Sequence, residues 1–117
     1  MTRHWPGTIY EAVTLLLSTM SDEEKESLKA TPRVDLITYH FSLGHYIRNA
    51  FGLWQGNDDL LQSCYPEVTD PQNLEYLKLD IDGASRRIVE ALWEKVREDG
   101  EKASRRSPDE IMGREQA

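Results

Sequence analysis

The feature that most constrains the fold of this chain is its longest run of apolar residues at helical spacing, between Val34 and Phe51. At about 100° per residue, one face of this run carries Leu36, His40, Leu43, Ile47, Ala50 and Phe51. A strand is excluded because alternate residues do not sort by polarity. Pro32 suits the first turn of a helix, and Gly52 suits the position after its last turn. The pattern therefore predicts a helix over residues 33–51.

Three residues in this predicted helix, one histidine, one arginine and one glycine, are unusual at or beside an apolar face. His40 falls in the middle of the apolar face, and we expect a buried core histidine with both nitrogens hydrogen-bonded, because no other His or Cys lies at ligand spacing there. Arg48 borders the face, which predicts an ion pair with an acidic side chain or hydrogen bonds to free carbonyls of the following loop. Gly44, inside the helix, predicts the close approach of another helix.

Capping residues predict four more helices. Thr8 and Ser21 each open a capping box, which begins the first two helices. Asn57 suits the cap of a helix over about 58–64, whose Leu60, Leu61 and Cys64 face the core, and Asp82 suits the cap of a last helix over about 83–98. The expected fold is all-α, a compact bundle of about five short helices around the central helix 33–51, which the first and last helices sandwich. Residues 1–98 would form the single domain and residues 99–117 a charged, mobile tail.

Composition excludes several function classes. The net charge of −7 argues against direct binding to nucleic acid or to anionic membranes, because both require a basic face. No stretch approaches the roughly 20 apolar residues of a membrane span. The single cysteine, Cys64, rules out an internal disulfide, so we expect a cytoplasmic protein in which this thiol serves as a small apolar residue.

Negative charge is concentrated in one segment. Seven acidic residues and a single basic one, Lys78, lie between Asn57 and Asp82, a net charge of −6. Such a segment is suited to a basic protein partner, and the alternative is a soluble loop with capped helices. The residues expected to bind the partner are Asp58, Asp59, Asp70, Asp80 and Asp82, with His45 and Asn49 on the exposed edge of the central helix.

Sequence patterns for catalysis, cofactors and metals are missing. The chain has no glycine-rich phosphate loop, no His-Glu-x-x-His and no Cys-x-x-Cys. The run from Asp80 to Gly83 superficially resembles a calcium loop but lacks the glutamate at the loop's last position. We therefore expect no cofactor and no metal, and a non-enzymatic function is favoured over an enzymatic one.

The residues 40–54 read HFSLGHYIRNAFGLW. They resemble the signature H-F-x-L-G-x-x-I-R-N-x-F-G-L-W of a small bacterial domain family that is catalogued only as of unknown function. In that family a short Leu-rich helix follows, and then an Asp-x-x-Ser motif begins the final helix, where this chain has Asp82 to Ser85. The family usually has proline before that motif, whereas Ile81 stands here. The resemblance covers about residues 34–96.

The resemblance implies a compact helical domain of bacterial or phage origin and brings no known activity. It makes Arg48, Asn49 and Trp54 candidates for a structural knot or a shared binding site, and stacking of the guanidinium on the indole is sterically feasible.

Two functions and one assembly state follow as expectations. The preferred function is a non-enzymatic interaction module, such as a regulator, immunity protein or phage inhibitor, that presents an acidic surface to a basic partner. The alternative is a small-ligand-binding protein or enzyme that uses a cluster of His40, Arg48, Asn49 and Trp54 on or next to the central helix. A homodimer is a further alternative, because three tryptophans exceed what so small a core usually hides.

Overall fold

The computed structural model of the protein describes the backbone of residues 5–116 and the side chains of residues 5–70, 72, 73 and 75–99. All regular secondary structure within residues 5–116 is helical, so the predicted all-α fold is confirmed. In chain order the elements are α1 (Ile9–Thr19), α2 (Asp22–Ala30), the 3₁₀-helix η1 (Arg33–Tyr39), the π-helix η2 (His40–Gly44), α3 (His45–Ala50), the 3₁₀-helix η3 (Leu53–Gln55), α4 (Asp58–Cys64), the 3₁₀-helix η4 (Pro71–Asn73), α5 (Leu74–Leu77) and α6 (Ile81–Gln116).

The predicted caps of the first helices and of α4 are present. The Thr8 hydroxyl accepts a hydrogen bond from the Glu11 N–H at 3.1 Å, which begins α1. Ser21 and Glu24 form the reciprocal pair of a capping box at 3.1 and 2.8 Å, which begins α2. Asn57 caps α4, whose bounds and buried face agree with the prediction.

The segment predicted as one regular helix over 33–51 is helical from residue 33 to residue 50, but it changes helix type twice. The 3₁₀-helix η1 turns more per residue than an α-helix and the π-helix η2 turns less, so side chains shift from their expected directions. Leu36, Ile47 and Phe51 are buried as predicted. Ala50 is exposed instead, and His40 is only half-buried.

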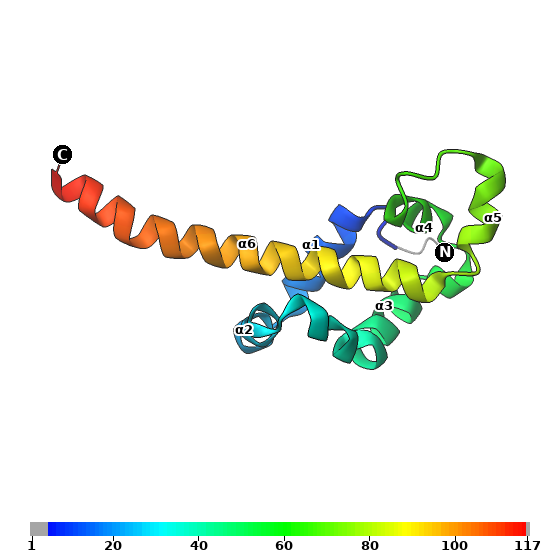
Figure 1. The fold of residues 1–117 in the computed structure, drawn as a ribbon, viewed down its shortest axis with the longest axis horizontal. Coiled ribbons are helices and arrows are strands. Elements are labelled where there is room, and N and C mark those ends of the chain that lie inside the picture. Colours follow the sequence, from blue (N-terminus) through cyan, green and yellow to red (C-terminus); the bar gives the residue numbers. More distant parts are fainter. Residues whose placement is uncertain (1–4, 117) are drawn as a thin grey trace.

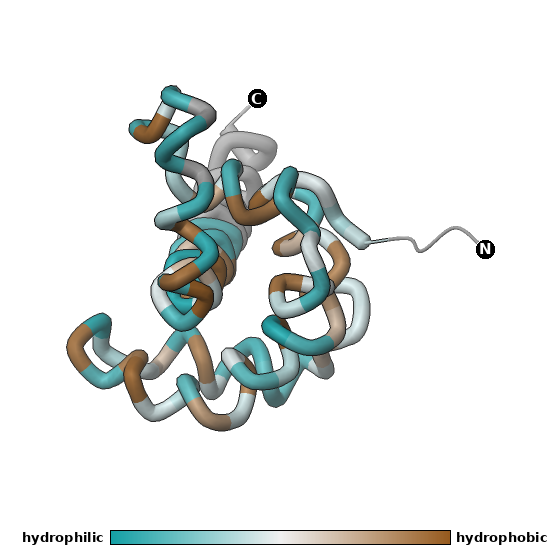
Figure 2. Tube along the Cα trace, turned by 90° about the vertical axis from the view of Figure 1, so that its right-hand side faces the viewer, coloured by the Kyte–Doolittle hydropathy of each residue, from teal (hydrophilic) through white to brown (hydrophobic). Residues whose placement is uncertain are grey.

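The shorter helices pack around the N-terminal half of α6, and not around the central segment as we expected. Helix α6 contacts α1, α2, α3, α4, η1 and η2, and Figures 1 and 2 show these elements gathered about it. Four residues of α6, at spacing i, i+1, i+4 and i+8, are fully buried: Ala84, Ser85, Ile88 and Leu92. The close approach predicted at Gly44 is to this helix, because an added Cβ on Gly44 would lie 3.8 Å from the Ser85 hydroxyl oxygen.

Helix α6 is longer at both ends than the predicted 83–98. It begins at Ile81, and the Asp80 carboxylate accepts a hydrogen bond from the Gly83 N–H at 3.3 Å, so Asp80 holds the capping position that we assigned to Asp82. Its helical backbone continues to Gln116 and extends away from the body, which makes the longest dimension 59 Å (Figure 1). The mobility of residues 99–117 stays a prediction.

Two contacts fasten the N-terminal segment to the loop between α3 and α4. Gly52 has a φ of +73°. A Cβ added to it would lie 2.4 Å from the nearest atom of the Trp5 ring, so the ring occupies the space that a side chain would need. The buried Asn57 amide donates hydrogen bonds to the carbonyls of Pro6 at 2.9 Å and Phe51 at 2.8 Å. This clasp holds the segment that leads into α1, the helix that forms part of one wall of the site described next.

Candidate docking cleft and the Arg48 junction

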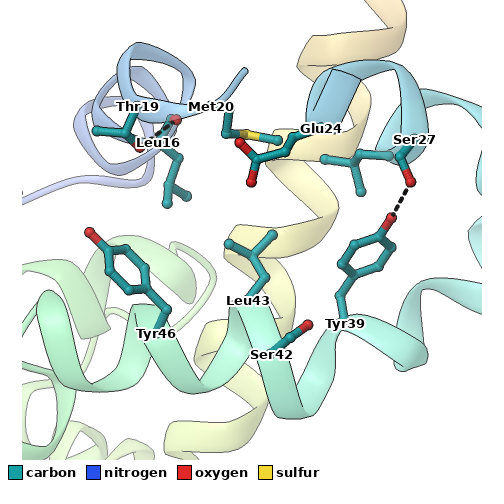
Figure 3. Close-up of a pocket in the computed structure, with 10 residues that line it drawn as sticks. Leu16, Thr19, Met20, Glu24, Ser27, Tyr39, Ser42, Leu43 and Tyr46 are labelled. Atoms are coloured by element: carbon teal, nitrogen blue, oxygen red, sulfur yellow. Dashed lines mark hydrogen bonds between the residues drawn. The ribbon is translucent and has the colours of Figure 1, made fainter. Parts of the chain in front are cut away.

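A half-open cleft of about 510 Å³ lies between the α1–α2 pair and the central segment (Figure 3). We call it the tyrosine cleft, and its lining consists of Leu16, Thr19, Met20, Glu24, Ser27, Leu28, Tyr39, Ser42, Leu43 and Tyr46. Leu16 and Leu28 are buried, with 2% and 0% of their surface exposed, whereas Tyr46 is 50% exposed. The cleft therefore joins an apolar floor to a polar, solvent-facing rim.

Local sequence explains the two walls. Helix α1 ends at Thr19 and the Ser21 capping box starts α2 two residues later, so the chain turns and the two helices share one side of the cleft. The other side is one face of the central segment, where Tyr39, Leu43 and Tyr46 project toward the α1–α2 pair (Figure 3).

Glu24 carries the charge of the cleft, as the one ionisable acid or base among the ten lining residues other than the tyrosines. Hydrogen bonds from the Ser21 backbone N–H and the Ser21 side chain hold the pKa of Glu24 below its ordinary value. The carboxylate is therefore ionised at neutral pH. At one end of the cleft, the Tyr39 hydroxyl lies 3.5 Å from the hydroxyl of Ser27 and 3.4 Å from that of Thr31.

Arg48 is buried at a junction between the central segment and α6, with 5% of its surface exposed. Its guanidinium donates to the Ser85 hydroxyl at 3.0 Å and to the His40 carbonyl at 3.3 Å. It also pairs with the Asp82 carboxylate at 3.5 Å. The predicted acidic partner is confirmed, while the carbonyl belongs to the π-helix and not to the following loop.

His40 and Trp54 do not join Arg48 in one binding site. The prediction that His40 is shut into the core is wrong: its ring is half-buried and packs edge-on against the exposed Phe41 at 4.9 Å between centroids. The space beside His40 holds only about 10 Å³. Trp54 is 57% exposed, whereas the three groups that hold the Arg48 guanidinium come from η2 and α6.

Most of the aspartates that we expected to bind a basic partner have partners within the chain. The contacts join Asp58 to Lys78 at 3.8 Å, Asp70 to the Gln72 N–H at 2.9 Å, Asp80 to the Tyr65 hydroxyl at 2.7 Å, and Asp82 to Arg48 at 3.5 Å. The contacts of Asp58 and Asp80 tether the segment between α4 and α6, and the two ion pairs neutralise part of the local charge. Asp59 is exposed on α4. The role of these residues in partner binding stays a prediction.

His45 and Asn49 are exposed on α3, where the Asn49 amide donates to the His45 carbonyl at 2.9 Å and lies 3.1 Å from His45 Nε2. Neither residue lines the tyrosine cleft. Their role in partner binding also stays a prediction.

Cys64 is a buried apolar residue, as predicted, with 1% of its surface exposed. Burial raises the pKa of the Cys64 thiol to about 12. Burial also raises the pKa of the neighbouring Tyr65, and the hydrogen bond from its hydroxyl to Asp80 raises it further. Both groups are therefore neutral over the physiological pH range.

These two groups predict a loss of stability at alkaline pH. The pKa of Cys64 is raised from an ordinary value of 9.0 to about 12, so the unfolded chain releases the proton first. The proton of Cys64 therefore does not change the free energy of unfolding below pH 9, and its release from the unfolded chain lowers that free energy as the pH rises from 9 toward 12. Urea unfolding at half-unit steps between pH 7 and pH 11 measures this decrease. The Cys64→Val variant should show a shallower slope, and a native thiol that reacts with a disulfide reagent at pH 8 as fast as in urea would contradict the assignment.

The helical period puts Tyr39 and Tyr46 on one flank of the apolar face of the central segment, but the period alone does not predict the cleft. The available signal was the spacing of Tyr39, Leu43 and Tyr46, which keeps three large side chains on one face. The spacing does not reveal where α2 lies, because neither segment carries a local signal that the two walls face one another.

A comparison with known protein families shows which family the chain belongs to. The family described as "Domain of unknown function (DUF6794)" matches residues 5–74, which is more than half of the 117 residues. The chain belongs to this family. No curated protein and no solved structure matches the chain. The expected membership of a family of unknown function is thus confirmed.

The part of the chain that matches DUF6794 includes every residue of the tyrosine cleft as well as Trp5, Gly52 and Arg48. It ends before α6, which supplies Ser85 and Asp82 to Arg48. Within the described residues, no helix combines the length and the apolar character that crossing a membrane requires.

Proposed function

We propose that this DUF6794 domain is a non-enzymatic protein-interaction module whose tyrosine cleft receives a partner protein. The observation that carries the proposal is a cleft open to solvent in which Met20 and Leu43 are partly exposed above buried leucines, rimmed by tyrosines and a carboxylate. Apolar surface of this kind marks binding sites on soluble proteins. Tyrosine is enriched at such sites because it covers a large area and keeps a polar hydroxyl at its tip.

The negative charge of the chain supports a partner with a basic surface. Glu24 is ionised at the rim, and the whole chain carries a net charge of −7. In this proposal the acidic segment 57–82 attracts the partner at long range, and the contact itself forms at the cleft. The division is supported by the aspartates of that segment, most of which already have hydrogen bonds or ion pairs inside the chain.

A small-ligand-binding function is the second candidate, because the cleft volume of about 510 Å³ is typical of small-molecule sites. The cluster of His40, Arg48, Asn49 and Trp54 supports this candidate less. Arg48 is buried and its charge is paired with Asp82, and the hollow beside His40 has almost no free volume. An enzymatic centre built on these residues is therefore disfavoured.

The proposed setting is the cytoplasm of a bacterium, or of a bacterium infected by a phage, where the domain acts as a small regulator, immunity protein or inhibitor. Support comes from the acidic composition, the single thiol and the resemblance of residues 40–54 to the signature of a bacterial domain family.

A matched pair of tyrosine variants tests the proposed function. Tyr46 in the cleft and Tyr76 on α5 are 50% and 69% exposed, so replacing either by alanine should leave the fold intact. With the purified chain as bait in a bacterial lysate, we expect Tyr46→Ala to reduce capture of a specific protein at least tenfold and Tyr76→Ala to leave it unchanged. The captured protein is then purified and its Kd measured with both variants. Equal affinity for Tyr46→Ala and the unmodified chain would refute the proposal.

A further inference from the structure

The wall of the tyrosine cleft formed by the central segment has a helical repeat. Tyr39, Ser42, Leu43 and Tyr46 stand at positions i, i+3, i+4 and i+7. Two helical turns separate the tyrosines, a span on the order of 10 Å along the segment. In Figure 3 the two rings stand at the ends of the cleft and Leu43 stands between them. This wall of the cleft is therefore elongated along the segment, with Leu43 in its middle.

The spacing of Tyr39, Leu43 and Tyr46 suits an α-helix laid along the cleft. Side chains at positions i and i+4 of a helix lie about 5–6 Å apart. Two such apolar anchors fit within the span between the tyrosines, one on each side of Leu43. The partly exposed side chains of Met20 and Leu43 provide apolar surface for the anchors, above the buried Leu16 and Leu28.

The charges along α2 specify the polar side of such a helix. Glu24 lines the cleft, whereas Asp22 and Glu26 line a separate hollow beside α2, together with Lys25 and Lys29. The two lysines of α2 are therefore not in the cleft, and Glu24 gives its wall a negative charge. A basic residue on the polar side of a bound helix would be attracted to Glu24, and an acidic residue would be repelled.

We infer that the natural occupant of the tyrosine cleft is an amphipathic α-helix of a partner protein, with two apolar anchors four residues apart and a Lys or Arg that faces Glu24. This inference rests on the proposed function and specifies its partner. Recognition of this kind relies on a few buried anchors in a groove and on charge at its edge.

Three synthetic peptides of equal length test the inference. The first is a helix of leucines at i, i+3, i+4 and i+7 with lysines elsewhere, the second replaces lysine with glutamate, and the third places proline in the middle of the first. By fluorescence anisotropy, we expect the basic helix to bind, and the acidic and proline-containing peptides to bind at least tenfold more weakly. A basic peptide that binds no better than the proline-containing one would overturn the requirement for a helix.

Cleft variants show whether the basic peptide binds in this cleft. Leu43→Ser should weaken binding at least tenfold, while Leu79→Ser, a change at a leucine that is 84% exposed and not part of the cleft lining, should leave it unchanged. Glu24→Gln keeps the capping box, because glutamine can accept the Ser21 hydrogen bond, but removes the charge. It should weaken binding three- to fivefold and reduce its salt dependence. Circular dichroism confirms that each variant is folded, and chemical-shift changes confined to the cleft give a second measure.

The outcomes separate this inference from the function on which it rests. If no peptide binds but Tyr46→Ala still abolishes capture of the natural partner, the helical occupant is wrong and the interaction function stands. If the basic helix binds equally to the unmodified chain and to Leu43→Ser, its binding is non-specific and the inference fails. A dimer detected by light scattering that Leu43→Ser dissociates would assign the cleft to a second copy of this chain and overturn the inference.

Discussion

Arg48→Ala is expected to lower the free energy of unfolding by about 3 kcal/mol, because it removes the buried aliphatic part of the side chain and the hydrogen bonds of its charged guanidinium. The guanidinium is 5% exposed and holds together the π-helix, through the His40 carbonyl, and the first turn of α6, through Ser85. Removing it leaves the His40 carbonyl without this donor and opens a void beneath Gly44, whose added Cβ would lie 3.0 Å from the guanidinium.

Thermal unfolding measures this effect, and a decrease in Tm of about 10 °C corresponds to it in a domain of this size. Hydrogen exchange gives the local effect, because amides of residues 40–44 should exchange faster when the π-helix loses this contact. Arg86→Ala is the matched control, since Arg86 is exposed on the same helix α6 and should change stability by less than about 0.5 kcal/mol. Equal effects of the two substitutions would show that the junction contributes nothing specific.

Gly52→Ala is expected to destabilise the protein by about 3 kcal/mol, for two reasons that a second glycine separates. Gly52 has a φ of +73°, where any Cβ is strained by about 1–2 kcal/mol. An alanine Cβ there would also meet the ring of Trp5 at 2.4 Å, so the indole would have to leave its place on the backbone.

Gly56 is the control because it shares the first cause and lacks the second. Its φ is +93°, and nothing lies within 4 Å of the position of an added Cβ. Gly56→Ala should therefore cost only the backbone term of about 1–2 kcal/mol. Urea unfolding of both variants gives the difference, which reports the packing of Trp5 against the loop. If the two variants were equally stable, the clasp between the N-terminal segment and Gly52 would be absent in solution.

The Arg48 junction also accounts for the two parts of the sequence motif that lie far apart. The arginine sits in residues 40–54, and Asp82 and Ser85 belong to the Asp-x-x-Ser motif at the start of the last helix. In the folded chain both residues of that motif contact the guanidinium, at 3.5 and 3.0 Å. Arg48 therefore links the two parts of the motif, and Asn49 and Trp54, the other candidates for a structural knot or a shared binding site, do not contribute to the contacts that hold its guanidinium.

Local chemistry along the chain was sufficient to predict where several helices begin. Thr8, Ser21 and Asn57 each accept a hydrogen bond from the N–H group three residues ahead, so the signal and the structure it forms lie within one turn. The same is true of the buried face of α4, whose leucines follow a regular α-helical period. The clustering of acids between residues 57 and 82 was equally visible, but their internal partners were not.

Only the tertiary structure decided how the central segment is wound and which helix forms the hub. The sequence between Arg33 and Ala50 favours a helix but does not specify its type. In the folded chain this segment contacts α6, among others through Gly44 and Arg48. Its 3₁₀ and π turns leave Ala50 exposed and His40 half-buried. The cleft likewise depends on α2 facing a segment that begins three residues after it ends. Periodicity reports which side of a helix is apolar, but which neighbour covers that side, and whether part of it stays open, is determined by the packing of the whole chain.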